Sequence, residues 1–143
     1  MTPRAHRLFA VVALAVTVAV LVWGFVVVGT PDQRRLERFD ERRLSDLRRI
    51  VREIDTFAYD RQRPGVLQHE LPKALKDLEG KTRHWKLSLL DPETGAPYGY
   101  VVKSETTYEV CATFNLPRDE DTGAFWNHPA GRHCFLIDAL SAP

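Results

Sequence analysis

The segment LLDPETGAPYGYVV, residues 89–102, combines a dense run of turn residues with an alternating apolar pattern. Asp91 followed by a proline favours an Asx-type turn, and Gly95 supplies the positive φ that a tight turn needs. The second proline of the segment suits the first residue of a strand. Tyr98 and Tyr100 then lie on the same face of that strand. The segment is therefore predicted to be a rigid link between strands, with both tyrosines directed toward a long helix.

Outside this link, apolar residues alternate with a period of two, which is typical of half-buried strands. The alternating stretches are residues 85–90, 98–102, 108–114 and 132–137. They predict an antiparallel sheet of three to four strands. A short helix is predicted before them, over residues 71–79, because Pro72 suits a first helical turn and Gly80 a stop.

Farther upstream, residues 31–59 carry apolar side chains at the helical period. These side chains are Leu36, Phe39, Leu44, Leu47, Ile50, Val51, Ile54, Phe57 and Ala58. Projected at 100° per residue, they fall within one arc of roughly 140°, so this stretch is predicted to be an amphipathic helix. The expected fold class is α+β, with the apolar stripe of the helix packed on the small antiparallel sheet.

The N-terminal region contains the uncharged run LFAVVALAVTVAVLVWGFVVV, residues 8–28. At about 1.5 Å per residue, this run matches the roughly 30 Å hydrocarbon core of a bilayer. A cleaved secretory signal is the competing interpretation, because Arg4 and Arg7 form a basic n-region. The predicted organisation is a cytoplasmic N-terminus (1–7), a transmembrane helix (8–29), the amphipathic helix (31–59) and a helix-and-sheet part of the same domain (60–143).

The overall charge is nearly balanced, with 20 Lys and Arg against 19 acids and a formal net charge of +1. Eight arginines and seven acids alternate between Asp32 and Asp55. No nucleic-acid partner is therefore expected, because no global field would concentrate a polyanion. The arginines that follow the apolar run would by themselves place the domain in the cytoplasm under the positive-inside rule.

The two cysteines favour the opposite orientation. Cys111 and Cys134 both lie in predicted strands, on the face away from Val110 and Phe135. One disulfide in an oxidising compartment is the expectation, and two reduced buried cysteines are the alternative. The expected location is the cytoplasmic (inner) membrane, with a single pass and the C-terminal domain outside the cytoplasm.

The order of these elements resembles that of pseudopilins and type IV pilin-like proteins. The resemblance is carried by Pro31 near the exit of the apolar helix, by residues 42–59 and 71–78, and by DPETGAPYGY at 91–100. The chain has neither the prepilin cleavage motif nor an acid in its apolar helix, so the likeness concerns the sheet and helix pattern. The resemblance implies a non-enzymatic component or partner of a cell-envelope assembly.

Candidate site residues follow from local patterns. Arg38, Arg42, Arg49 and Trp126 are predicted to form an interaction surface with another membrane or envelope protein. No catalytic residue and no cofactor are expected, because no nucleophile, phosphate-loop or zinc-protease motif occurs.

Two alternatives remain open. The first is an exported metal- or ligand-binding module that uses His128 and His133, with Asp119 and Asp121 as weaker metal candidates. The second is a cytosol-facing anchor that binds anionic lipid through the arginine-rich helix.

Overall fold

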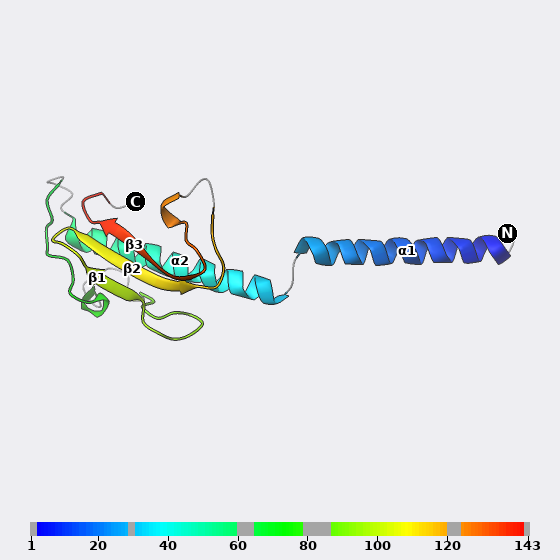
Figure 1. Cartoon of the computed structure of the whole chain (residues 1–143), viewed down its shortest axis with the longest axis horizontal. Helices are drawn as coiled ribbons and strands as arrows, with labels where there is room; N and C mark the ends of the chain where they lie inside the picture. The colour runs from blue at the N-terminus through cyan, green and yellow to red at the C-terminus, as the bar shows by residue number, and fades with distance from the viewer. Residues whose placement is uncertain (1–2, 29–30, 60–64, 79–86, 120–123, 142–143) are drawn as a thin grey trace. The chain divides into compact units, whose positions relative to one another are not determined.

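The computed structural model describes residues 3–28, 31–59, 65–78, 87–119 and 124–141 (Figure 1). The chain divides into two compact units, residues 1–35 and 36–143. The first unit contains α1, Pro3–Val28, which is apolar along most of its length. Its window His6–Gly24 is long and apolar enough to cross a membrane, and no side chain in that window is buried by the protein.

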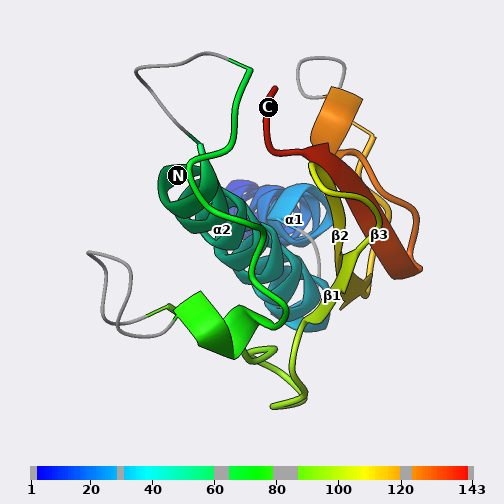
Figure 2. The ribbon, with the colours of Figure 1, turned by 90° about the vertical axis from the view of Figure 1, so that its left-hand side faces the viewer.

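The second unit contains α2 (Pro31–Ala58) from residue 36 onward, and this helix provides the helical half of the core. The predicted amphipathic helix is confirmed to within one residue. The residues that α2 buries are mainly the predicted apolar ones, namely Leu44, Leu47, Ile50, Val51, Ile54 and Ala58. They belong to one cluster with the inward-facing side chains of the sheet, and α2 lies along that face (Figure 2). The unit is thus one helix packed on one sheet, as the α+β prediction required.

The sheet consists of β1 (Gly99–Val102), β2 (Thr107–Phe114) and β3 (Gly131–Asp138), in the antiparallel order β1-β2-β3. Tyr108, Val110, Ala112 and Phe114 of β2 are buried, whereas Thr113 is exposed. This alternation directs the even-numbered residues of β2 toward α2. The predicted strands over 98–102, 108–114 and 132–137 are therefore confirmed.

Two predicted elements are wrong in their described parts. Residues 87–89 form no strand, and Leu90 makes only an isolated bridge to Pro97. Their alternation reflects packing, because Leu87 and Leu89 are half-buried against the core without pairing to a strand. The predicted helix over 71–79 is reduced to the 3-10 turn η1, Leu75–Leu78. It starts late because the Asp77 carboxylate accepts the Ala74 N–H at 2.9 Å and closes a tight turn there.

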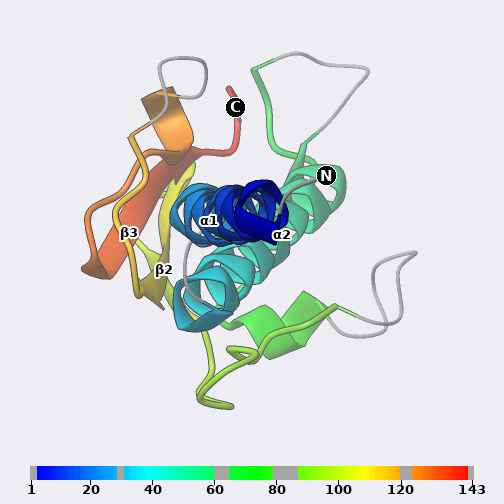
Figure 3. The ribbon, with the colours of Figure 1, turned by 90° about the vertical axis from the view of Figure 1, so that its right-hand side faces the viewer.

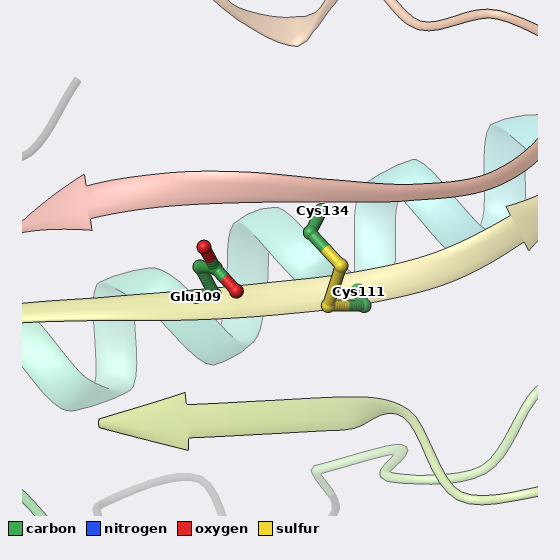
Figure 4. Close-up of side chains that lie close together, drawn as sticks. All are labelled: Glu109, Cys111 and Cys134. Atoms are coloured by element: carbon green, nitrogen blue, oxygen red, sulfur yellow. A yellow bond between two sulfur atoms is a disulfide. The ribbon is translucent and has the colours of Figure 1, made fainter. Parts of the chain in front are cut away.

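The disulfide between Cys111 and Cys134 is confirmed (Figure 4). The two cysteines are directly opposite each other in β2 and β3, with their Cα atoms 4.0 Å apart, on the face away from α2. Gly99 of β1 pairs with Cys111 on the other side. A Cβ at Gly99 would lie 2.9 Å from the Cys111 Cβ, so a glycine is needed for β1 to approach the disulfide.

Candidate interaction surface

A buried ion-pair network joins α2 to the turn of residues 91–96. The Arg43 side chain is 2% exposed, and its Nε donates to Asp91 Oδ2 at 2.6 Å. Its Nη1 donates to Asp40 Oδ1 at 2.7 Å, and its Nη2 donates to Glu93 Oε2 at 2.5 Å. One guanidinium thus binds three carboxylates, two of which come from a segment about 50 residues away in the sequence.

The carboxylates of this network also bind backbone groups. Asp40 accepts the N–H groups of Asn115 and Leu116, at the end of β2. Asp91 accepts the N–H groups of Glu93 and Thr94, which holds the turn closed. The network therefore fixes α2, the turn and the end of β2 in one arrangement.

One feature of the sequence indicates this network. At 100° per residue, Asp40 and Arg43 project into the middle of the apolar arc of α2, where a solvated charge is not expected. Two opposite charges on the buried face of a helix indicate an internal ion pair. Asp40 and Arg43 are one helical turn apart, so their pairing is local, whereas Asp91 and Glu93 join them from a distant turn.

The pKa values of the network follow from this geometry. Burial alone raises the pKa of Asp91, but hydrogen bonds from Arg43 and from the N–H groups of Thr94 and Glu93 outweigh burial and lower the pKa to about 2. Burial likewise opposes the charged form of Arg43, but its hydrogen bonds to the three carboxylates outweigh burial and raise the pKa of Arg43. The central pair is thus ionised throughout the neutral range.

This network makes acid stability depend on Asp91. The folded state holds the pKa of Asp91 below its ordinary value of 3.8, so the stabilisation is complete above about pH 4 and is lost as the pH falls toward 2. The contribution is about 2 kcal/mol. The Asp91→Asn variant, although less stable at neutral pH, is expected to lose less of its remaining stability between pH 4 and pH 2, measured by urea unfolding. The exposed Asp119→Asn is the control, and equal losses in all three proteins would contradict the assignment.

The exposed surface of α2 is far more basic than its sequence. Its exposed arginines are Arg34, Arg35, Arg38, Arg42, Arg49 and Arg52. Its exposed acids are Asp32 and Glu41, whereas Glu37, Asp40, Asp46, Glu53 and Asp55 are buried or half-buried. The near balance of charge along the sequence therefore does not hold at the surface.

Four of these arginines form a continuous stripe, here called the arginine face: Arg38, Arg42, Arg49 and Arg52. They project within one arc of about 80° at the helical period. Within the described part of the chain, none of the four makes an ion pair. The structure thus brings together the predicted Arg38, Arg42 and Arg49 and adds Arg52, which was not among the predicted residues.

Two acids of α2 are held by contacts inside the domain. Asp40 belongs to the Arg43 network, and Asp46 Oδ2 accepts the Tyr98 hydroxyl at 3.0 Å. The predicted meeting of Tyr98 with the long helix is therefore confirmed. Arg42 and Asp46 are also one helical turn apart, but no ion pair forms between these two described residues.

Trp126 belongs to the short turn η2, Ala124–Trp126. It is half-buried, with its ring centroid 4.8 Å from that of Phe135. The Arg48 guanidinium lies over the indole, 5.4 Å from the ring centroid. Trp126 is thus largely engaged by its own domain, and the neighbouring Phe125 is the more exposed aromatic residue.

The histidine candidates lie in an aromatic cluster. His128 is 5% exposed, and its ring stacks on Phe114 with centroids 3.6 Å apart. The His133 ring lies 6.5 Å from that of His128 and 4.7 Å from that of Phe135. Burial lowers the pKa of His128, which keeps the ring neutral within this packing.

The acidic metal candidates are not gathered with the histidines in the described structure. Asp119 is exposed and accepts the Asn127 side-chain amide at 3.4 Å. Asp121 lies outside the described residues. Among those residues, the three side chains of ligand type that gather are Glu109, Cys111 and Cys134 (Figure 4). The two sulfurs are bonded to each other, so this group offers a metal no thiolate.

Comparisons with protein-family models, curated proteins and solved structures find no match to this chain. The pilin-like resemblance therefore rests on the order of elements in the sequence and remains a prediction.

Proposed function

We propose that this chain is a non-enzymatic, single-pass membrane-anchored protein that recognises an acidic surface of another envelope protein. The arginine face of α2 is the observation that carries the proposal. In this reading, α1 is the anchor and the second unit is the recognition domain, as a component or partner of a cell-envelope assembly.

The chemistry of the arginine face suits a protein partner that presents carboxylates. Guanidinium groups bind carboxylates through two parallel hydrogen bonds, which adds geometric specificity to the charge attraction. Successive arginines on one helix face match a run of acids on another helix or strand. An electrostatic surface of this kind steers association and selects the partner.

Rigidity of α2 strengthens this proposal. The helix is held by its apolar stripe and by the Arg43 network at its centre. The arginine face on its opposite side is therefore preorganised, which reduces the entropy lost on binding. A membrane anchor would further restrict the search for a partner to two dimensions.

The disulfide supports a location outside the cytoplasm, because such bonds persist in oxidising compartments and are rare in the cytosol. A reporter enzyme fused after Pro143 tests the orientation. Activity of the reporter restricted to the cytoplasm would overturn the exported location.

Photo-cross-linking in native membranes tests the recognition proposal. A photoreactive residue at the exposed Ser45, within the arc of the arginine face, is expected to capture a protein, identified by mass spectrometry. The triple reversal Arg38→Glu, Arg42→Glu and Arg49→Glu should abolish that adduct, because attraction becomes repulsion. The control is the reversal of Lys73, Lys76 and Lys103 to Glu, which changes the net charge equally at exposed positions elsewhere and, at Lys103, also removes a surface ion pair with Glu109.

The same experiment separates the alternatives. Adducts to phospholipid alone would overturn the protein-partner proposal and favour the anionic-lipid anchor. A protein adduct that survives the arginine reversal would show that another surface makes the contact.

A further inference from the structure

The open edge of β3 carries a row of backbone groups directed away from the sheet. Cys134 is directly opposite Cys111 with Cα atoms 4.0 Å apart, which is the close spacing of a non-hydrogen-bonded pair. Pair types alternate along an antiparallel ladder. The N–H and C=O groups of Arg132, Cys134 and Leu136 therefore point away from β2.

These groups have no backbone partner within the described structure. The bonds beyond β3 on this side involve its end, where the Asp138 carbonyl accepts the Ser141 N–H at 3.0 Å. β3 lies at the edge of the sheet opposite β1 (Figures 2 and 3). An eight-residue edge strand of this kind is a template for pairing with another strand.

The side chains of the same strand form a self-complementary pattern on the sheet face away from α2. Along β3 this face carries Arg132, the disulfide sulfur of Cys134, Leu136 and Asp138. The Arg132 guanidinium extends toward Gly99 of β1, and the Asp138 carboxylate accepts the Leu140 N–H at 3.0 Å, so both side chains must turn toward the open edge for a charge pair to form there. Leu136 is 57% exposed, so an apolar centre lies between two opposite charges. A copy of the strand running in the opposite direction presents the opposite charge at each end.

We infer that two copies of this chain pair through the edges of their β3 strands, antiparallel and about a two-fold axis, to form one six-stranded sheet. Phe135 of each copy lies at the axis, which places Arg132 opposite Asp138 of the other copy at both ends. Cys134 then lies opposite Leu136.

A shift of two residues in one direction places Arg132 opposite Leu136 of the other copy. A shift in the other direction places Arg132 opposite a residue past the end of β3. Only the unshifted register therefore pairs Arg132 with Asp138 at both ends. Cross-strand pairs of opposite charge and apolar pairs both stabilise a sheet. A symmetric contact of this type closes as a dimer and leaves no further edge of the same kind.

Phe125, 41% exposed and with its ring 6.1 Å from that of Phe135, lies near the axis and would be covered as well. This inference does not depend on the arginine face.

Charge exchange tests the register. The full chain is reconstituted in nanodiscs large enough for two copies, and its dimer fraction is measured by mass photometry over a range of protein-to-lipid ratios. Arg132→Asp and Asp138→Arg should each weaken dimerisation roughly tenfold, because both end pairs become repulsive. The double variant Arg132→Asp/Asp138→Arg should restore it, because the pairs return with inverted sign. Lys73→Asp is the control for an exposed charge elsewhere.

A zero-length cross-link tests the contact itself. In Arg132→Lys, carbodiimide should join the introduced amine to Asp138 of the other copy. Six residues of strand separate the two positions by roughly 20 Å within one chain, so the linked peptides can come only from two copies. A chain that stays monomeric at every ratio and gives no such link would overturn the inference. The inference would also be overturned if Arg132→Asp and Asp138→Arg each left the dimer fraction unchanged.

Discussion

Replacement of Arg43 by methionine is expected to lower the free energy of unfolding of the second unit by about 3–5 kcal/mol. Methionine is similar in length and apolar, so the core keeps most of its volume. The loss arises because Asp40 and Asp91 stay buried, at 8% exposure each, without the cation that neutralises them. Domains of this size are stable by only about 5–15 kcal/mol, so the variant would be close to unfolding.

Urea unfolding of the full chain in detergent micelles, followed by near-ultraviolet circular dichroism, measures this effect. Arg49→Met is the matched control, because it removes the same side chain from the exposed face of the same helix. That variant should change stability by less than about 0.5 kcal/mol. Equal effects of the two substitutions would show that the Arg43 network does not hold the domain together.

A double-mutant cycle separates the lost ion pair from lost packing. Arg43→Met combined with Asp91→Asn should cost less than the sum of the two single changes, because the second change removes a carboxylate that the first left uncompensated. Strictly additive effects would indicate that the two groups do not interact in solution.

Removal of the disulfide is the second large expected effect. The double variant Cys111→Ala/Cys134→Ala should lose about 3 kcal/mol, because the bond closes a loop between residues 23 apart and restricts the unfolded chain. The same unfolding measurement applies. Alanine at both positions avoids leaving a free thiol on the sheet surface.

The control for this prediction is chemical. A strong thiol reductant under denaturing conditions, followed by refolding, should destabilise the natural chain to about the level of the double variant and leave the double variant unchanged. Two readily labelled thiols in the chain isolated from its membrane without reductant would show that the bond does not form in the cell.

The periodic features of this chain were predictable from its sequence. The helix over residues 31–59 follows from apolar residues at the helical period, and the three observed strands follow from alternation with a period of two. Both patterns are local, because each element buries one of its own faces whatever lies opposite. The faces of Cys111 and Cys134 follow from the same alternation.

Local sequence patterns gave wrong predictions where the same spacing of apolar residues fits two different structures. The alternating leucines at 87 and 89 are half-buried without strand pairing, because burial and ladder hydrogen bonds are separate requirements. The shortened turn at 75–78 depends on one hydrogen bond between Asp77 and Ala74.

The feature that depended most on the tertiary structure is which charged side chains of α2 are buried and which are exposed. The sequence by itself determined that α2 carries arginines and acids in nearly equal number, and that its apolar stripe must be covered. Only the tertiary structure decided which charges stay inside, because Arg43 meets Asp91 across 48 residues and Asp46 meets Tyr98 across 52. Interactions between charges depend on distance and burial in space, which spacing along a chain does not specify. The arginine face is the part of α2 that remains exposed after those internal pairings are made.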